Sequence, residues 1–295
     1  MSAIVFHCGY AKAGSTWLQK QVFPNLPNVN YLGRRYTVEG RFPHNFRDGS
    51  LANVVESIAT QACPNLQLEE AVESLTEVLR RDRLNVMSDE NLLRPGNARV
   101  LAGSLSALAR SVDSVRVLLI VREQWSLVWS RYMQDYRFSG KEQLLEEMIF
   151  EGGIRRCFFP WCLRRGACEC QERNQKSISL DYYDFGEVLR ELKEDLVGVE
   201  VHLVPAEALF SLHEVGCRIF ESAFPSIPGC MSVLSGRGGH SVNRRGDDER
   251  ARIADLNGAK LAELREQVRG RFKRSNKRLG EELGIDLEEF GYASR

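Results

Sequence analysis

Short apolar runs alternate with amphipathic segments along the chain and predict alternating strands and helices. Four runs have the length and aliphatic content of buried strands, and they lie at residues 3–6, 84–87, 115–121 and 199–204. Apolar residues recur at helical spacing in four other segments, at residues 51–59, 68–79, 141–150 and 181–196. This alternation predicts an α/β protein with three layers, α/β/α, around a central, mainly parallel sheet. The segment 29–48 shows no clear period, and we expect a long loop there.

The first predicted strand leads into a short turn of small residues. Gly9 and Gly14 bracket this turn, Lys12 lies inside it, and Ser15 and Thr16 stand where a helix is expected to begin. A strand, a glycine turn and a helix N-terminus together form an anion site, because free backbone N–H groups and the helix dipole point at the bound group. The stretch therefore predicts a site for a nucleotide 5′-phosphate, although a turn that needs glycine only for its shape would look similar.

This turn differs from a Walker phosphate loop. The Walker form places Lys directly after its second Gly, where its amine reaches the β- and γ-phosphates. Here Ser15 follows Gly14 and the Lys comes earlier, at Lys12. The position of Lys12 argues against ATP or GTP hydrolysis of the Walker type.

Acidic residues follow the second predicted strand. Asp89 and Glu90 come directly after it, behind Ser88. Ligands of open α/β sheets bind beyond the carboxyl ends of strands, where a carboxylate is well placed to take a proton. Glu90 is the preferred catalytic base and Asp89 the alternative. A plain helix or turn cap at Ser88 or Asp89 is the other interpretation.

The strand predicted at 115–121 ends in Arg122, and Ser130 follows eight residues later on an expected helix. A guanidinium binds phosphate through two parallel hydrogen bonds, and a hydroxyl adds one more donor. This pair therefore predicts a second phosphate site.

The motif Tyr-x-Lys-x-Gly-Ser-Thr-Trp-Leu at 10–18 resembles the 5′-phosphosulfate loop of sulfotransferases that use 3′-phosphoadenylyl sulfate (PAPS). The Arg122…Ser130 pair resembles their 3′-phosphate signature, and the segment 88–90 resembles the Ser-x-Glu of bacterial and heparan-type members. The resemblance, closest to bacterial carbohydrate sulfotransferases, implies one P-loop NTPase-like sulfotransferase domain over 1–295. It implies catalytic roles for Lys12 and Glu90. It implies PAPS as the cofactor and adenosine 3′,5′-bisphosphate as the product formed from it. The residues implied to bind the cofactor are Lys12, Ala13, Gly14, Ser15, Thr16, Trp17, Arg122, Ser130, Arg237 and Arg244.

Two further segments lie outside this pattern or match it loosely. Residues 151–176 are rich in Cys, Arg and aromatic residues, and the spacing of Cys157, Cys162, Cys168 and Cys170 does not suit the usual zinc knuckle. We expect an acceptor-side insertion without metal, with structural zinc as the alternative. The Gly-rich basic segment 233–246 is in the place of the family's lid loop, although it lacks the Arg-Lys-Gly of cytosolic members. A plain flexible loop is the alternative.

Composition limits the partners. Forty basic and forty acidic residues cancel, so no overall field attracts nucleic acid or an anionic membrane. No apolar run is long enough to span a bilayer, and no basic region precedes an apolar one at the N-terminus. We therefore expect a cytoplasmic enzyme without stable membrane insertion.

The resemblance implies transfer of a sulfuryl group by in-line displacement, with a hydroxyl or amine of a glycan or glycolipid as the acceptor. The Arg- and aromatic-rich segments 29–48 and 155–165 suit an anionic glycan, while a small phenol or a lipid alcohol is the alternative acceptor. Two other functions stay open. One is a P-loop nucleotide kinase or other phosphotransferase, which would need ATP and Mg²⁺, and the other is a non-catalytic protein that binds adenosine 3′,5′-bisphosphate.

Overall fold

The computed structural model of the chain describes residues 2–10, 13–33, 50–60, 67–90, 92–93, 96–130, 154–157, 175–178, 180–236 and 258–294. These residues fall into two compact units. The first unit spans Met1–Arg122 and Val188–Arg244, and the second unit spans Glu123–Glu187 and Arg245–Arg295. The single catalytic domain over 1–295 stays a prediction.

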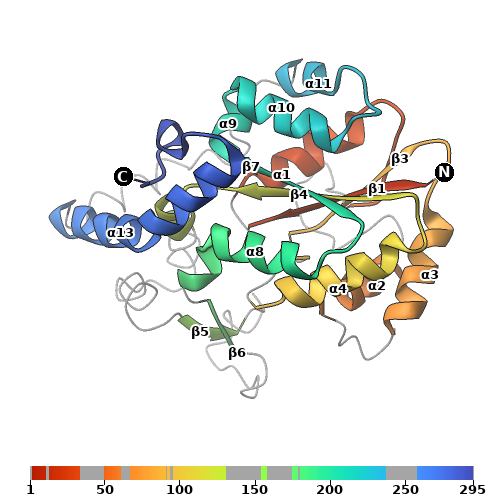
Figure 1. The fold of residues 1–295 in the computed structure, drawn as a ribbon, viewed down its shortest axis with the longest axis horizontal. Coiled ribbons are helices and arrows are strands. Elements are labelled where there is room, and N and C mark those ends of the chain that lie inside the picture. The colour runs from red at the N-terminus through yellow and green to blue at the C-terminus, as the bar shows by residue number, and fades with distance from the viewer. Residues whose placement is uncertain are drawn as a thin grey trace. The chain divides into compact units, whose positions relative to one another are not determined.

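A five-stranded parallel sheet forms the centre of the first unit (Figure 1). Its strand order is β2-β3-β1-β4-β7. The strands are β1 (Ala3–Gly9), β2 (Val29–Tyr31), β3 (Leu84–Ser88), β4 (Ser114–Val121) and β7 (Val199–Pro205). The predicted α/β class with a parallel central sheet is therefore confirmed. Its central strands are buried on both faces, which is why they read as continuous aliphatic runs.

Helices cover both faces of this sheet (Figure 1). One face carries α2 (Ser50–Thr60), α3 (Leu68–Val78) and α4 (Ala98–Ala109). The other face carries the helical segment after β1, which consists of α1 (Ser15–Trp17), the π-helix η1 (Leu18–Val22) and the 3-10 helix η2 (Phe23–Asn25). The same face carries α9 (Ala206–Phe210), α10 (Glu214–Ala223) and α11 (Cys230–Gly236). This arrangement confirms the three layers.

Two segments differ from the sequence prediction, 29–48 and 233–246. The predicted lid loop 233–246 begins inside α11, which extends to Gly236, and residues 237–246 lie outside the described residues. We expected a loop over 29–48, but Val29–Tyr31 forms β2, an edge strand that pairs in parallel with β3. A strand of three residues is too short to show a period in the sequence. The strand forms because its backbone pairs with β3. Residues 34–49, the remainder of that predicted loop, lie outside the described residues.

The second unit is organised around the long helix α13 (Gly258–Leu283). A buried amide pair ties this helix to the helical residues 124–130: Gln124 Nε2 donates to Asn276 Oδ1 at 2.7 Å, and Asn276 Nδ2 donates to Gln124 Oε1 at 3.1 Å. Asn276 Nδ2 also donates to the carbonyl of Ala293 at 3.0 Å, which fixes the C-terminal segment. The unit further contains α8 as far as Glu187 (the helix spans Phe185–Asp195), η4 (Leu180–Tyr183), η5 (Leu287–Phe290) and the antiparallel pair β5 (Ile154–Cys157) and β6 (Gln175–Ile178).

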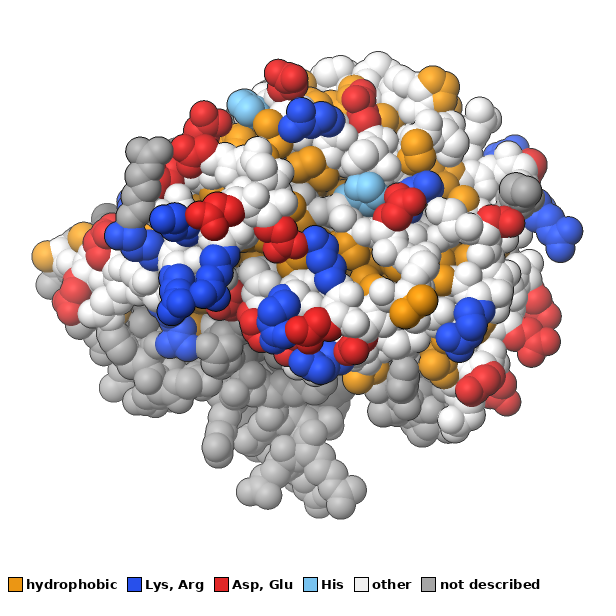
Figure 2. Space-filling view, viewed as in Figure 1, with side chains coloured by type: hydrophobic (Ala, Val, Ile, Leu, Met, Phe, Trp, Pro, Cys, Tyr) orange, Lys and Arg blue, Asp and Glu red, His pale blue; other side chains and the backbone are white. Residues whose placement is uncertain are grey.

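Acidic and basic side chains are interspersed on the face seen in Figure 2, in keeping with the balanced composition. Among the described residues, no helix combines the length and the apolar character that a membrane span requires.

Candidate functional site

The carboxyl ends of the parallel strands bring the predicted site segments of the first unit to one edge of the sheet. The register places His7 of β1 beside Ser88 of β3 and beside Leu118 of β4, so these three strands end at nearly the same level. The turn after β1, the acidic segment after β3, Arg122 after β4 and helix α9 after β7 therefore emerge at this edge. Ligands bind at such an edge in open α/β sheets.

The turn after β1 presents backbone donors. Gly14 adopts the left-handed conformation, with φ of 93°. The amides of Ala13 and Trp17 are used inside the turn, where they donate to the carbonyls of Tyr10 and Gly14 at 3.0 Å each. The amides of Gly14, Ser15 and Thr16 make no hydrogen bond to any residue in the described part of the chain. Consecutive free amides in this conformation form a concave site for an anion.

Gly14 is required for a second reason. A Cβ atom at this position would lie 2.1 Å from Cζ of Phe210, the last residue of α9. Phe210 also contacts Trp17, with ring centroids 5.3 Å apart in an edge-on arrangement. The predicted cofactor residue Trp17 is thus 9% exposed, and its indole packs on α9. Helix α9 therefore supports the turn through one aromatic side chain, a contact that the sequence did not indicate.

Two buried polar atoms without partners lie beneath the turn. They are Oγ of Ser15 and Nε2 of His7. The other ring nitrogen of His7, Nδ1, lies 2.7 Å from Oγ of Ser88. Burial lowers the pKa of His7 to about 3, so the imidazole is neutral at physiological pH. Sequence reasoning missed His7, and the available signal was its place two residues before Gly9, on the same face of β1.

The two acidic residues after β3 differ in burial. Asp89 is 1% exposed. The pKa of the nearby Cys8 thiol is raised, mainly because the thiol is buried and to a smaller extent because of the negative charge of Asp89. Glu90 is half-buried in the turn that follows. Of the two predicted bases, Glu90 is therefore the one that an acceptor molecule reaches more easily.

Arg122 already has an acidic neighbour. Its Nε lies 3.9 Å from Oε1 of Glu207, in the first turn of α9, and the two side chains are 39% and 29% exposed. Because β4 and β7 are neighbours in the sheet, the residues that follow them meet at its edge. An ion pair between partly exposed groups is weak.

Other predicted residues lie elsewhere. Ser130 is half-buried in the helical residues 124–130 of the second unit, while Arg122 ends the first unit, so their pairing stays a prediction. Lys12, Arg237 and Arg244 lie outside the described residues, as do Cys162, Cys168 and Cys170. Within the described part of the chain, no group of three or more His, Cys, Asp or Glu side chains is arranged to hold a metal ion.

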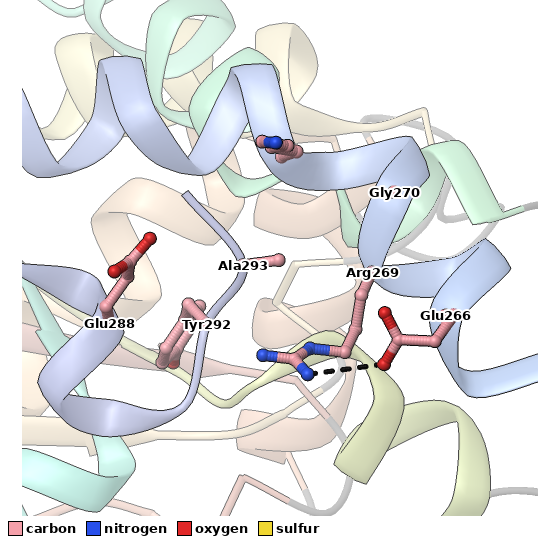
Figure 3. A pocket seen from close by; sticks show the side chains of 7 residues that line it. Glu266, Arg269, Gly270, Glu288, Tyr292 and Ala293 are labelled. Atoms are coloured by element: carbon pink, nitrogen blue, oxygen red, sulfur yellow. Dashed lines mark hydrogen bonds and ion pairs between the residues drawn. The ribbon is translucent and has the colours of Figure 1, made fainter. Parts of the chain in front are cut away.

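The second unit contains an open cavity of about 470 Å³ beside α13 (Figure 3). Its lining consists of Glu266, Arg269, Gly270, Lys273, Glu288, Tyr292 and Ala293. Arg269 Nη1 contacts Glu266 at 3.4 Å, and the lining carries two cations and two carboxylates. This balance of charge does not favour a multiply charged anion. None of the predicted site residues lines this cavity.

A phosphate fits the turn after β1. The three free amides and the hydroxyl of Ser15 are all hydrogen-bond donors, and an unpaired buried polar group is costly unless a ligand or water satisfies it. Anionic oxygens accept such donors better than neutral groups do. The donor set at the end of β1 is therefore suited to a phosphate group of a nucleotide.

Comparison with known proteins finds likenesses in structure but no matching family. No protein-family model matches the chain, and no curated protein matches it. One similar solved structure is the crystal structure of a sulfotransferase from Alicyclobacillus acidocaldarius, with 15% sequence identity, coverage of 99% of both chains and a TM-score of 0.48. A likeness of this size defines no activity for the chain, and the proposed function rests on the site residues.

Proposed function

We propose that the chain is a PAPS-dependent sulfotransferase that modifies a hydroxyl or amine of a carbohydrate acceptor. The observation that carries the proposal is a set of three consecutive amides, Gly14 to Thr16, that have no hydrogen-bond partner among the described residues and lie next to the buried hydroxyl of Ser15. The 10–18 motif, with Lys12 inside the turn, separates this loop from a Walker loop and favours a sulfotransferase over a kinase.

The predicted cofactor residues would divide the work of binding. The amides of Gly14, Ser15 and Thr16 donate to the 5′-phosphate, and Lys12 Nζ neutralises negative charge that develops there. Arg122 binds the 3′-phosphate, and Ser130 adds a hydroxyl donor. Arg237 and Arg244 close over the nucleotide as part of a lid. PAPS, when bound, supplies an activated sulfuryl group.

Proton transfer would fall to Glu90. Its carboxylate takes the proton from the acceptor hydroxyl or amine as the acceptor oxygen or nitrogen attacks. Its position after β3 and its partial exposure support this role over that of the buried Asp89. The acceptor class follows from the resemblance and from the Arg- and aromatic-rich segments 29–48 and 155–165, which suit an anionic glycan.

The first test is calorimetric titration of the full chain with adenosine 3′,5′-bisphosphate, with AMP and ATP·Mg²⁺ as competitors. Tight binding that depends on the 3′-phosphate is expected, because AMP lacks the group that Arg122 binds. A preference for ATP·Mg²⁺ would favour a kinase instead. No binding of any of the three would refute a nucleotide site.

The second test separates catalysis from binding. Lys12→Ala is expected to abolish sulfuryl transfer, and Glu90→Gln to lower it by a factor of about 10² to 10⁴, the usual contribution of a general base. Asp89→Asn serves as the matched control for Glu90→Gln. Turnover like that of the unmodified protein in Lys12→Ala would disprove the mechanism. Tight bisphosphate binding without any turnover would identify a non-catalytic binding protein.

A further inference from the structure

Four buried polar side chains form a line beneath the turn after β1. Gln19 lies on the π-helix η1, Ser88 ends β3, His7 lies on β1, and Ser15 begins α1. All four are essentially inaccessible to solvent. Buried polar groups in folded proteins are normally hydrogen-bonded, so the direction of each hydrogen bond in this line can be derived.

The first hydrogen bond fixes the direction of the next. Gln19 Nε2 lies 3.4 Å from the backbone carbonyl of Ser88 and 3.2 Å from its Oγ. A carbonyl oxygen only accepts, so the Gln19 atom that faces it is the amide nitrogen and not the amide oxygen. The same nitrogen also donates to Oγ of Ser88. The hydroxyl of Ser88 therefore accepts from Gln19 and keeps its own proton for another partner.

That partner is His7. Among the described residues, Nδ1 of His7, at 2.7 Å, is the atom that can accept the hydroxyl proton of Ser88. If Nδ1 carried a proton instead, the hydroxyl proton of Ser88 would be buried without an acceptor, at a substantial cost. Nδ1 therefore accepts. Because the imidazole is neutral, its one proton is then on Nε2.

Nε2–H of His7 is thus a buried donor with no acceptor among the described residues. Oγ of Ser15 is also buried and has no hydrogen-bond partner among these residues. A Cβ atom on Gly9 would stand 3.4 Å from Nε2 of His7 and 2.9 Å from Oγ of Ser15. Both atoms therefore lie close to the same point beside Gly9, which has no side chain to separate them. A hydrogen bond from His7 Nε2–H to Ser15 Oγ is absent from this structure and would have to form when the anion binds.

We propose that Gln19, Ser88 and His7 form a hydrogen-bond relay that ends on Ser15 and turns the hydroxyl proton of Ser15 toward the bound anion. In this relay, Gln19 N–H donates to Ser88 Oγ, Ser88 O–H to His7 Nδ1, His7 Nε2–H to Ser15 Oγ, and Ser15 O–H to the anion. His7 is a positioning residue, since it acts through Ser15. The relay rests on the proposed function, because it serves the same phosphate loop.

The value of such a relay is preorganisation. A hydroxyl that accepts from His7 cannot point its own proton at His7, so fewer directions are left for that proton and the binding of an anion imposes less reorientation. The neutral imidazole supplies this constraint without adding a charge beneath the loop. The relay therefore predicts a contribution of His7 to anion binding that does not change between about pH 5 and pH 8.

The decisive measurement for the tautomer needs no ligand. In the full chain with ¹⁵N-labelled histidine, the ring nitrogens of His7 are assigned by their loss in His7→Asn, and their chemical shifts are followed with pH. The expected result is a neutral ring with the proton on Nε2 and no titration from about pH 8 to about pH 5. A proton on Nδ1, or titration near the ordinary value for histidine, would overturn the relay.

Binding measurements test delivery to the anion. Adenosine 3′,5′-bisphosphate is titrated into the unmodified protein, Ser88→Ala and Ser104→Ala. Ser104, a buried serine of α4 that donates to the carbonyl of Val100 at 3.0 Å, is the matched control. Loss of the Ser88 hydroxyl is expected to weaken binding about tenfold, the size of one hydrogen bond. Ser104→Ala is expected to bind like the unmodified protein, and thermal unfolding confirms that each variant is folded.

A double variant identifies Ser15 as the end of the relay. In a Ser15→Ala background, Ser88→Ala is expected to cause no further loss of affinity, because the group that it positions is gone. Equal binding by Ser88→Ala and the unmodified protein, or additive losses in the double variant, would overturn the relay and leave the nucleotide site intact. Failure of the unmodified protein to bind the bisphosphate would refute the proposed function together with the relay.

Discussion

The two phosphate sites proposed in the first unit are built in different ways. At the end of β1 the donors are backbone amides and one hydroxyl, unpaired and fixed in place by the turn, by Phe210 and by the residues beneath. At the end of β4 the donor is a side chain, Arg122, which is partly exposed and faces Glu207 at 3.9 Å. The first site is preorganised, whereas the second must loosen an ion pair before it binds.

This difference assigns different roles to the two sites. In the proposed function, the backbone site at Gly14–Thr16 would accept the 5′-phosphate of any nucleotide, because its donors recognise only an anionic group. In the same proposal, Arg122 would distinguish a nucleotide with a 3′-phosphate from one without it. Affinity is thus expected to come mainly from the end of β1, and selectivity from the end of β4.

The largest effect is expected from Gly14→Ala. The left-handed φ of 93° costs a residue with a side chain about 1–2 kcal/mol, and a methyl group 2.1 Å from Phe210 costs about 1–3 kcal/mol more. Bisphosphate binding should be lost, and the free energy of unfolding in urea should fall by about 3 kcal/mol. The control is Gly270→Ala in α13, where a Cβ meets nothing within 4 Å and stability should rise by about 0.5–1 kcal/mol. Unchanged binding in Gly14→Ala would show that the turn does not hold the anion.

Arg122→Ala tests selectivity. It should weaken binding of adenosine 3′,5′-bisphosphate by about 10- to 100-fold, the worth of a charge-assisted hydrogen bond, and leave AMP binding nearly unchanged. Arg116→Ala is the matched control, because Arg116 lies on the same strand and pairs with Glu200 at 3.0 Å. An equal loss for both nucleotides would remove the distinction between the two sites.

The neutral His7 beneath the β1 site predicts a pH dependence of stability. Burial lowers the pKa of His7 from 6.5 to about 3. Between about pH 6.5 and pH 3, His7 is therefore protonated in the unfolded chain but stays neutral in the folded protein. Its contribution to stability is therefore complete above about pH 6.5 and is lost as the pH falls, by up to about 1.4 kcal/mol per pH unit. Urea unfolding at several pH values measures this slope. His7→Asn should reduce the slope of the unfolding free energy against pH by the amount that corresponds to one bound proton. An unchanged slope would contradict a buried neutral imidazole.

The smallest effect is expected from Glu207→Gln. Removal of the carboxylate next to Arg122 relieves its repulsion of a bound phosphate, so the bisphosphate should bind about two- to threefold more tightly, in line with a weak, partly exposed ion pair. AMP affinity should not change. Weaker bisphosphate binding in this calorimetric titration would mean that Glu207 holds Arg122 in its binding position.

The β1 and β4 ends also differ in how far the sequence predicted them. The strands β1, β3, β4 and β7, the turn at Gly14 and the position of Arg122 were all predicted from local patterns of apolar and small residues, and the structure confirms these elements. Strand β2 was missed because three residues, Val29–Tyr31, carry no readable period. The roles of Lys12, Glu90 and Ser130 stay predictions.

The sequence by itself determined which segments become buried strands, since burial on both faces demands a continuous aliphatic run and a tight turn demands glycine. Only the tertiary structure decided which strands are neighbours. The order β3-β1-β4-β7 places Ser88 beside His7 and Glu207 beside Arg122, although 81 residues separate the first pair in the chain. Such contacts depend on the pairing of distant segments through backbone hydrogen bonds, which leaves no local signal in the sequence.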